Sequence, residues 1–208
     1  MAGLKTFLGR LSPLLGVVTP AALYERQRVL VDIGLIKTRG GRGPGSGVPF
    51  TAENLAALVI SILATDSLSE IDQRVVDLCN AQPEPTLERQ SRAHETWVKR
   101  GKPTFLTEVA RVLSGQPLQW RPKDPISGIR VTRMWRAQIL PDLYAPHLLK
   151  VLTFVPPHWE RIAESALPIS LTAEIDEVAL GRLITFFSHT DFAVRAALKA
   201  SQDQEEPE

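Results

Sequence analysis

The clearest local signals in the chain lie in residues 19–36, which read TPAALYERQRVLVDIGLI. A threonine followed directly by proline is typical of a helix N-cap and a first helical position. Gly34 follows the last apolar residue and suits the left-handed position at which many helices end. The pattern therefore predicts a helix from Thr19 to Ile33, whose inner stripe holds Leu23, Leu30 and Ile33.

Shorter elements are expected on both sides of this helix. Apolar residues at helical spacing predict a helix over Gly3–Leu11, and Ser12-Pro13 predicts a second short helix that ends before Gly16. After Gly34, the sequence predicts a strand over 35–37, a glycine-rich basic loop over 38–47 and a return strand over 48–50. Thr51 then caps a further apolar helix that reaches about residue 64.

This order of two helices, a hairpin with a basic tip and another helix resembles the winged helix-turn-helix of bacterial transcription regulators. The resemblance covers the first third of the chain and rests on Leu14-Leu15-Gly16, Thr19-Pro20-Ala21-Ala22-Leu23, Leu30 and Gly34-Leu35-Ile36 with the loop that follows. It implies that Thr19–Ile33 is a recognition helix, which enters the DNA major groove with its N-terminal end. The DNA-contacting residues that it implies are Thr19, Ala21, Ala22, Tyr24, Glu25 and Arg28 on the helix, and Lys37, Arg39 and Arg42 on the loop.

Several of these residues can be given roles from their chemistry. Arg28 can pair with guanine or bind a phosphate, and Glu25 can accept a hydrogen bond from cytosine or orient Arg28. The Tyr24 hydroxyl can reach a phosphate. Arg39 and Arg42 suit contacts to the DNA backbone or the minor groove.

The C-terminal half of the expected recognition helix departs from the family pattern. Val29, Val31 and Ile33 make it apolar nearly all round. A second buried face is therefore expected, covered by the rest of the chain or by another subunit.

Charge is unevenly distributed along the 208 residues, whose formal net charge is +1. Residues 1–64 carry 7 − 3 = +4, and the remainder carries 17 − 20 = −3. A basic N-terminal unit on a mildly acidic body is compatible with a local nucleic-acid contact. The single cysteine excludes an intrachain disulfide framework, and a cytoplasmic location is expected because neither a signal peptide nor a membrane-length apolar run is present.

The remaining two thirds predict an α+β body. Helices are expected over 67–80, 86–100, 104–114, 159–165, 176–187 and 191–200, and strands over 129–139, 147–155 and 168–175. The whole chain is therefore expected to be α+β and helix-rich, with about three strands. The expected division is 1–64 as the DNA-binding unit, 65–200 as a dimerisation or sensing domain, and 201–208 as an acidic disordered tail.

No residue pattern predicts an active site, a metal site or a cofactor. The four histidines lack metal-ligand spacing, no phosphate-binding glycine motif is complete, and Cys79 is expected to be a small core residue. Arg130, Arg133 and Arg136, preceded by Arg121 and Lys123, form a second basic cluster. That cluster is expected to be a solvated strand face, with a secondary DNA contact or an acidic-ligand site as the alternative.

The sequence therefore favours a homodimeric, sequence-specific double-stranded DNA-binding regulator that represses by occupying an operator. Such a protein needs no catalytic residue, and its body would dimerise the chain, sense a small-molecule or protein effector of unknown identity, or both. Two alternatives stay open: a DNA-packaging or plasmid-maintenance protein built as a larger oligomer, and a protein–protein adaptor whose winged helix does not touch DNA.

Overall fold

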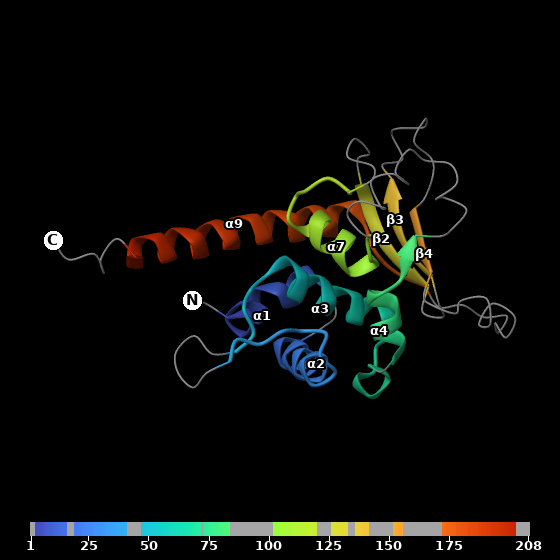
Figure 1. Cartoon of the computed structure of the whole chain (residues 1–208), viewed down its shortest axis with the longest axis horizontal. Coiled ribbons are helices and arrows are strands. Elements are labelled where there is room, and N and C mark those ends of the chain that lie inside the picture. The colour runs from blue at the N-terminus through green and yellow to red at the C-terminus, as the bar shows by residue number, and fades with distance from the viewer. Residues whose placement is uncertain are drawn as a thin grey trace, which may run out of the picture.

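The computed structural model describes residues 3–15, 19–40, 47–71, 73–83, 102–119, 126–132, 136–141, 152–155 and 172–202. Within these ranges the fold is α+β, with six α-helices, a short 3₁₀ helix and a five-stranded antiparallel sheet. The helices lie to one side of the sheet, and the long C-terminal helix α9 runs from the sheet across the helical layer (Figure 1).

Helix α1 (Leu4–Leu14) is one continuous helix, so the expected restart at Ser12-Pro13 is wrong. Pro13 lies in the last turn, where its missing N–H removes the bond to the carbonyl of Gly9 alone. Gly9 is exposed, so water can satisfy that carbonyl. The apolar stripe of Leu4, Leu8 and Leu11 is buried along the whole helix and favours its continuation.

Helix α2 (Pro20–Asp32) begins and ends as the sequence predicts. The Thr19 hydroxyl accepts a hydrogen bond from the Ala22 N–H at 3.2 Å, and Gly34 takes the left-handed conformation at φ 79°. Leu23 and Leu30 are buried, but Ile33 is 38% exposed and does not belong to the inner stripe. The other buried residues of this helix are Arg26 and Gln27. Ile33 is the C-cap residue beyond the last helical residue, Asp32, and lies outside the buried face.

The two arms of the loop after α2 are not regular strands. Residues 35–37 and 48–50 form no strand ladder with each other; the structure has only isolated antiparallel bridges here, between Arg39 and Gly47 and between Gly3 and Pro49. Pro49 cannot donate to a ladder, which limits regular strand pairing on the returning arm. The outcome is a loop with a paired base rather than the expected hairpin of two strands.

Helix α3 (Ala52–Ala64) is buried on nearly every side and lies at the centre of the helical layer. It contacts α2, α4 (Gln73–Cys79), α7 (Phe105–Leu113) and two strands of the sheet. Buried side chains from Leu4 to Phe187 form one hydrophobic cluster around it. A domain boundary at residue 64 would therefore pass through a continuous core.

The expected helix over 67–80 is divided into η1 (Leu68–Glu70) and α4. Ile71, between them, has ψ 82°, outside the helical range.

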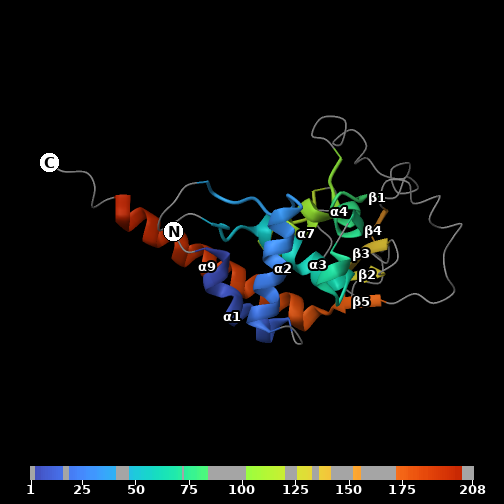
Figure 2. The same cartoon turned by 90° about the horizontal axis from the view of Figure 1, so that it is seen from below.

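The sheet contains β1 (Gln82–Pro83), β2 (Ile126–Thr132), β3 (Arg136–Pro141), β4 (Leu152–Val155) and β5 (Thr172–Ile175). Figure 2 shows them in the order β1-β4-β3-β2-β5. The expected single strand over 129–139 is a hairpin, in which Ile129 pairs with Ile139 and Val131 with Ala137. The alternation of apolar and polar residues continues through both strands of the hairpin, because residues paired across two strands lie on the same face of the sheet. The sheet has five strands rather than about three, and the two-residue β1 is too short to show a pattern.

The helix expected over 104–114 is α7, which follows a capping box between Thr104 and Thr107 and ends before Gly115 at φ 68°. Helix α9 (Glu177–Gln202) replaces the two helices expected over 176–187 and 191–200. Neither glycine nor proline interrupts residues 188–190, so nothing in the backbone stops the first helix there. The expected helices over 86–100 and 159–165, and the tail after residue 202, lie outside the described residues.

Candidate nucleic-acid interface

The start of α2 is open to solvent. Thr19, Pro20 and Ala21 are exposed, and Ala22 is half-buried. These small residues leave the helix backbone accessible, and the positive end of the helix dipole lies at the same place. The arrangement suits the approach of an anionic surface to the first turn of α2.

Farther along α2, Arg28 is paired with an acidic neighbour. Its Nη1 lies 3.1 Å from Oε2 of Glu25, and the two side chains are 60% and 47% exposed. An exposed pair of this kind contributes about 0–1 kcal/mol, so a competing phosphate or base can replace it. Asp32 is also exposed, and the three charged groups on this face sum to 1 − 2 = −1.

Tyr24 is half-buried and packs under a cation from another helix. Nζ of Lys5, on α1, lies 4.6 Å from the centroid of the Tyr24 ring. This contact places an exposed positive charge beside α2 that the sequence pattern did not assign to the interface.

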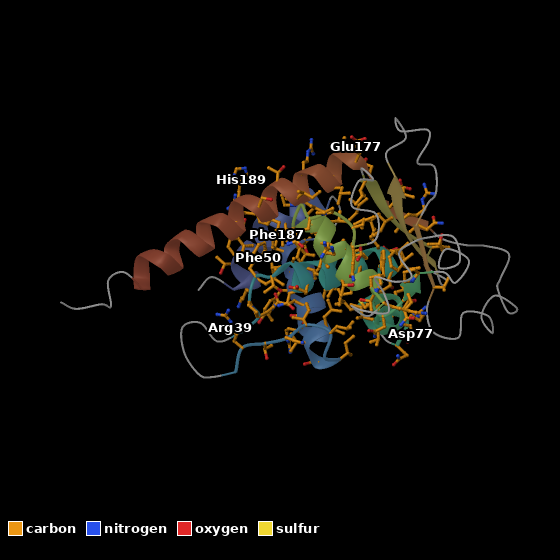
Figure 3. All side chains as sticks on the ribbon, turned by 45° about the horizontal axis from the view of Figure 1, so that its top comes forward. Arg39, Phe50, Asp77, Glu177, Phe187 and His189 are labelled. Atoms are coloured by element: carbon orange, nitrogen blue, oxygen red, sulfur yellow. The ribbon has the colours of Figure 1, made fainter. Side chains whose placement is uncertain are left out.

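The loop after α2 presents two exposed cations, Lys37 and Arg39 (Arg39 is labelled in Figure 3), whereas Arg42 lies outside the described residues. The backbone of Arg39 pairs with Gly47 through an N–H to carbonyl bond of 2.8 Å. Below this pair, the buried Asn54 amide donates to the carbonyls of Pro49 at 3.0 Å and Lys37 at 3.5 Å. One side chain on α3 therefore ties both arms of the loop together.

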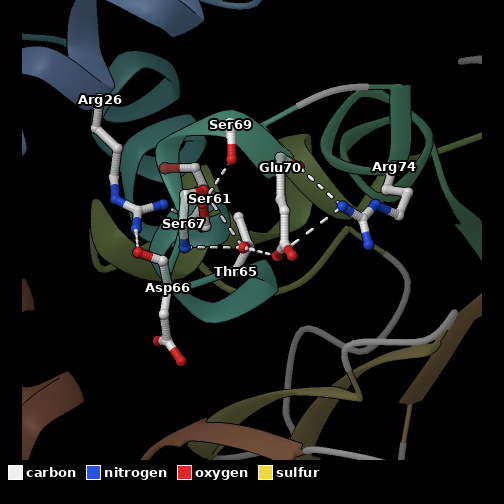
Figure 4. Close-up of polar contacts among 8 residues, drawn as sticks. All are labelled: Arg26, Ser61, Thr65, Asp66, Ser67, Ser69, Glu70 and Arg74. Carbon is white, nitrogen blue, oxygen red and sulfur yellow. Dashed lines mark hydrogen bonds and ion pairs between the residues drawn. The ribbon is translucent and has the colours of Figure 1, made fainter.

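Arg26 holds α2 against the other end of α3 (Figure 4). Its side chain is only 4% exposed, and its guanidinium donates to the carbonyls of Ser61 at 2.8 Å and Asp66 at 3.1 Å. The Thr65 hydroxyl, next to this site, accepts a hydrogen bond from the Ser67 N–H at 3.1 Å and donates one to the Glu70 carboxylate. The same carboxylate lies 3.9 Å from the guanidinium of Arg74. The network fixes the position of α2 relative to the core.

Sequence reasoning missed both anchoring residues, although each left a signal. Asn54 and Ser61 are polar residues among the apolar positions of α3, and buried polar groups need partners. Arg26 lies between Leu23 and Leu30 on the buried stripe of α2, so its head group also required a partner inside the protein.

The second basic cluster is only partly described. Arg130 on β2 pairs with Glu174 on β5 at 2.7 Å, which neutralises it. Arg121, Lys123 and Arg133 lie outside the described residues, as does the side chain of Arg136.

Two other buried ionisable groups lie away from this surface. Burial raises the pKa of the Cys79 thiol to about 12, which makes it an inert core residue as expected. Burial also raises the pKa of Glu108 on α7 above 4.5, although the Gln119 N–H and Arg111 oppose this shift. Oε2 of Glu108 accepts from Gln119 at 3.1 Å, while Oε1 has no hydrogen-bond partner among the described residues.

Two concave regions flank α9. A polar cavity of about 740 Å³ lies between the start of α3, α7 and α9, and its floor includes the stacked rings of Phe50 and Phe187 (both labelled in Figure 3). A groove of about 920 Å³ lies between α1 and α9. The described residues contain no cluster of three or more potential metal ligands.

Among the helices that the structure describes, none has the length and apolar character needed to cross a membrane.

The candidate site consists of an exposed, capped helix start, an Arg28–Glu25 pair and a basic loop, all held on α3 by Arg26 and Asn54. No family model, curated protein or solved structure matches this chain.

Proposed function

We propose that the protein binds double-stranded DNA through α2 and the loop over residues 37–47, and that it regulates transcription by occupying its site. The observation that carries this proposal is the clamp formed by Asn54, which fixes the base of a basic loop beside an exposed helix. A surface that must fit two features of one duplex needs such a fixed relation between its parts.

Each part of the surface has a role in the proposed complex. Lys37 and Arg39 contact phosphates, whose counterions are released on binding. The first turn of α2 enters the major groove, where Ala21 and Ala22 permit a close approach of the backbone. Arg28 exchanges its bond to Glu25 for a base edge or a phosphate.

Binding to a duplex of random sequence at a series of salt concentrations tests the backbone contacts. We expect the combined change Arg39→Ala and Arg42→Ala to make the log–log salt slope shallower by roughly two, because each arginine accounts for about one phosphate contact. Lys102→Ala, at an exposed position just before α7 and distant from the loop along the chain, is the control and should leave the slope unchanged. An unchanged slope in the double variant would exclude the loop from the DNA contact.

Selection of bound fragments from a random duplex pool tests base recognition. Against the selected site, Arg28→Ala should weaken binding by roughly 1–3 kcal/mol and relax the preference at one position. If Arg28 contacts only phosphate, affinity falls equally for all sequences. If affinity is the same before and after the change, Arg28 has no role in binding.

A protein–protein adaptor is the second candidate, favoured by the charge of α2. Its exposed face carries Glu25 and Asp32 against Arg28, and Ile33 is 38% exposed beside them. An adaptor would show no salt-dependent retention on duplex DNA, whereas the proposed regulator would.

A further inference from the structure

The groove between α1 and α9 is formed by one face of each helix. It is lined by Gly9, Arg10, Pro13 and Leu14 from α1, and by Glu177, Val178, Gly181, Arg182, Thr185, Phe186 and His189 from α9. A Cβ added at Gly9 or Gly181 would meet no heavy atom within 4 Å, so both positions are open. Val178 is 62% exposed and so offers apolar surface to an occupant of the groove.

The second half of the same helix, residues 191–202, extends beyond the other described elements in both views (Figures 1 and 2). Their sequence, DFAVRAALKASQ, confines its charges to positions four residues apart and is otherwise mostly apolar. An isolated helix of this length is marginal in water, because most helical stability in proteins comes from packing an apolar face.

We propose that α9 pairs antiparallel with α9 of a second copy of this chain, so that each projecting half lies in the partner's groove between α1 and α9. The groove spans residues 177–189, about 20 Å of helix, and the projecting half spans 191–202, about 18 Å. The two lengths therefore match. The two-fold axis crosses α9 midway between residues 189 and 190, the centre of Glu177–Gln202.

Symmetry makes a second copy the occupant that fits both observations at once. The groove and the projecting segment follow one another on a single helix, so one two-fold operation fills both grooves and covers both segments. Such an isologous contact closes at two copies and leaves no further groove to extend the assembly.

The contact carries charges of both signs on each side. The groove carries Arg10 and Arg182 with Glu177, and the projecting half carries Arg195 and Lys199 with Asp191. The cations at the groove rim also pack on apolar surface, since the guanidinium of Arg10 lies 5.2 Å from the centroid of the Phe186 ring.

Single-cysteine cross-linking of the full chain tests the pairing and its direction, because Cys79 is fully buried and does not interfere. His189→Cys places the new thiol about half a residue from the axis along the helix, so mild oxidation should give a disulfide-linked dimer. Val178→Cys is the matched control: in the antiparallel pair its two copies lie about 34 Å apart along the helix axes and should not cross-link. Cross-linking through residue 178 would indicate a parallel pair and overturn the proposal.

Sedimentation of the native chain and of variants without DNA tests the occupant. The wild type should be a dimer, and Gly181→Trp, which fills the groove, should raise the dimer dissociation constant by about a hundredfold or more. A chain ending at Thr190 should be monomeric, whereas one ending at Gln202 should still dimerise. Gln73→Trp, at an exposed position on α4, controls for the added ring. A monomeric wild type, or a dimer that survives either Gly181→Trp or loss of residues 191–202, would overturn the proposal without affecting the proposed DNA contact.

Discussion

Replacing Arg26 by methionine should destabilise the protein strongly although it removes no apolar contact. The guanidinium donates two charge-assisted hydrogen bonds inside the protein, to the carbonyls of Ser61 and Asp66. Bonds of this type contribute about 1.5–3 kcal/mol each. The Ser61 carbonyl also accepts a hydrogen bond from the Thr65 N–H at 3.3 Å, so it keeps a donor when the guanidinium is removed. The lower value of about 1.5 kcal/mol per bond therefore applies. The expected loss in the free energy of unfolding is therefore about 3 kcal/mol.

Arg28→Met is the matched control, because it makes the same change two residues along the same helix. Arg28 is 60% exposed and pairs with the exposed Glu25, so the expected loss is below about 1 kcal/mol. Both variants should be measured by urea-induced unfolding, in which an unchanged slope shows that the midpoint shift reports stability. Arg26→Lys, which keeps the charge but can reach only one carbonyl well, should fall between the two.

A single result would refute the reasoning behind this difference. If Arg26→Met loses no more stability than Arg28→Met at equal slopes, the buried bonds to the end of α3 do not anchor α2. The network in Figure 4 would then be a consequence of helix packing, and not its cause.

Three further changes test other parts of the core. Above pH 4.5 the unfolded chain loses the Glu108 proton before the folded protein does, so wild-type stability should fall as pH rises toward the native pKa, and Glu108→Gln should remove this decline in urea unfolding across pH. Gly128→Ala would bring a Cβ to 2.7 Å from the Ile175 carbonyl and should cost about 1–3 kcal/mol in thermal unfolding, whereas Gly181→Ala, with open space around it, should be neutral or slightly stabilising. A fragment of residues 1–64 should show no cooperative unfolding by circular dichroism, because it exposes the faces of α3 that α4, α7 and the sheet cover; a cooperative transition would make that segment an independent domain.

The helix ends were predictable from sequence because local chemistry sets them. Thr19 and Thr104 cap the helices they precede, and Gly34 and Gly115 end them in left-handed conformations. Each of these signals acts within a few residues, so no knowledge of the tertiary fold is needed to interpret it.

The errors arose where tertiary packing overrode a local signal or where a local signal was ambiguous. Pro13 is compatible with a helix start and with a last turn, and burial of the Leu4, Leu8 and Leu11 stripe selected the second. The alternation over 129–139 is the same for one long strand and for a hairpin in register. Arg26 and Asn54 were missed at the candidate site because their partners lie up to 40 residues away in the chain.

These two residues also explain how the candidate DNA surface is joined to the rest of the protein. Asn54 holds the basic loop against the first turn of α3. Arg26 holds α2 against the last turn of α3. Both parts of the surface are therefore fixed to opposite ends of one helix, which is itself enclosed by α4, α7 and the sheet. Because helix α3 is buried on nearly every side and cannot shift without disturbing its neighbours, a change in the packing of the body would move α2 and the loop together. The candidate surface and the body are therefore coupled through α3, and a signal received by the body would need no separate linker to reach the proposed DNA contact.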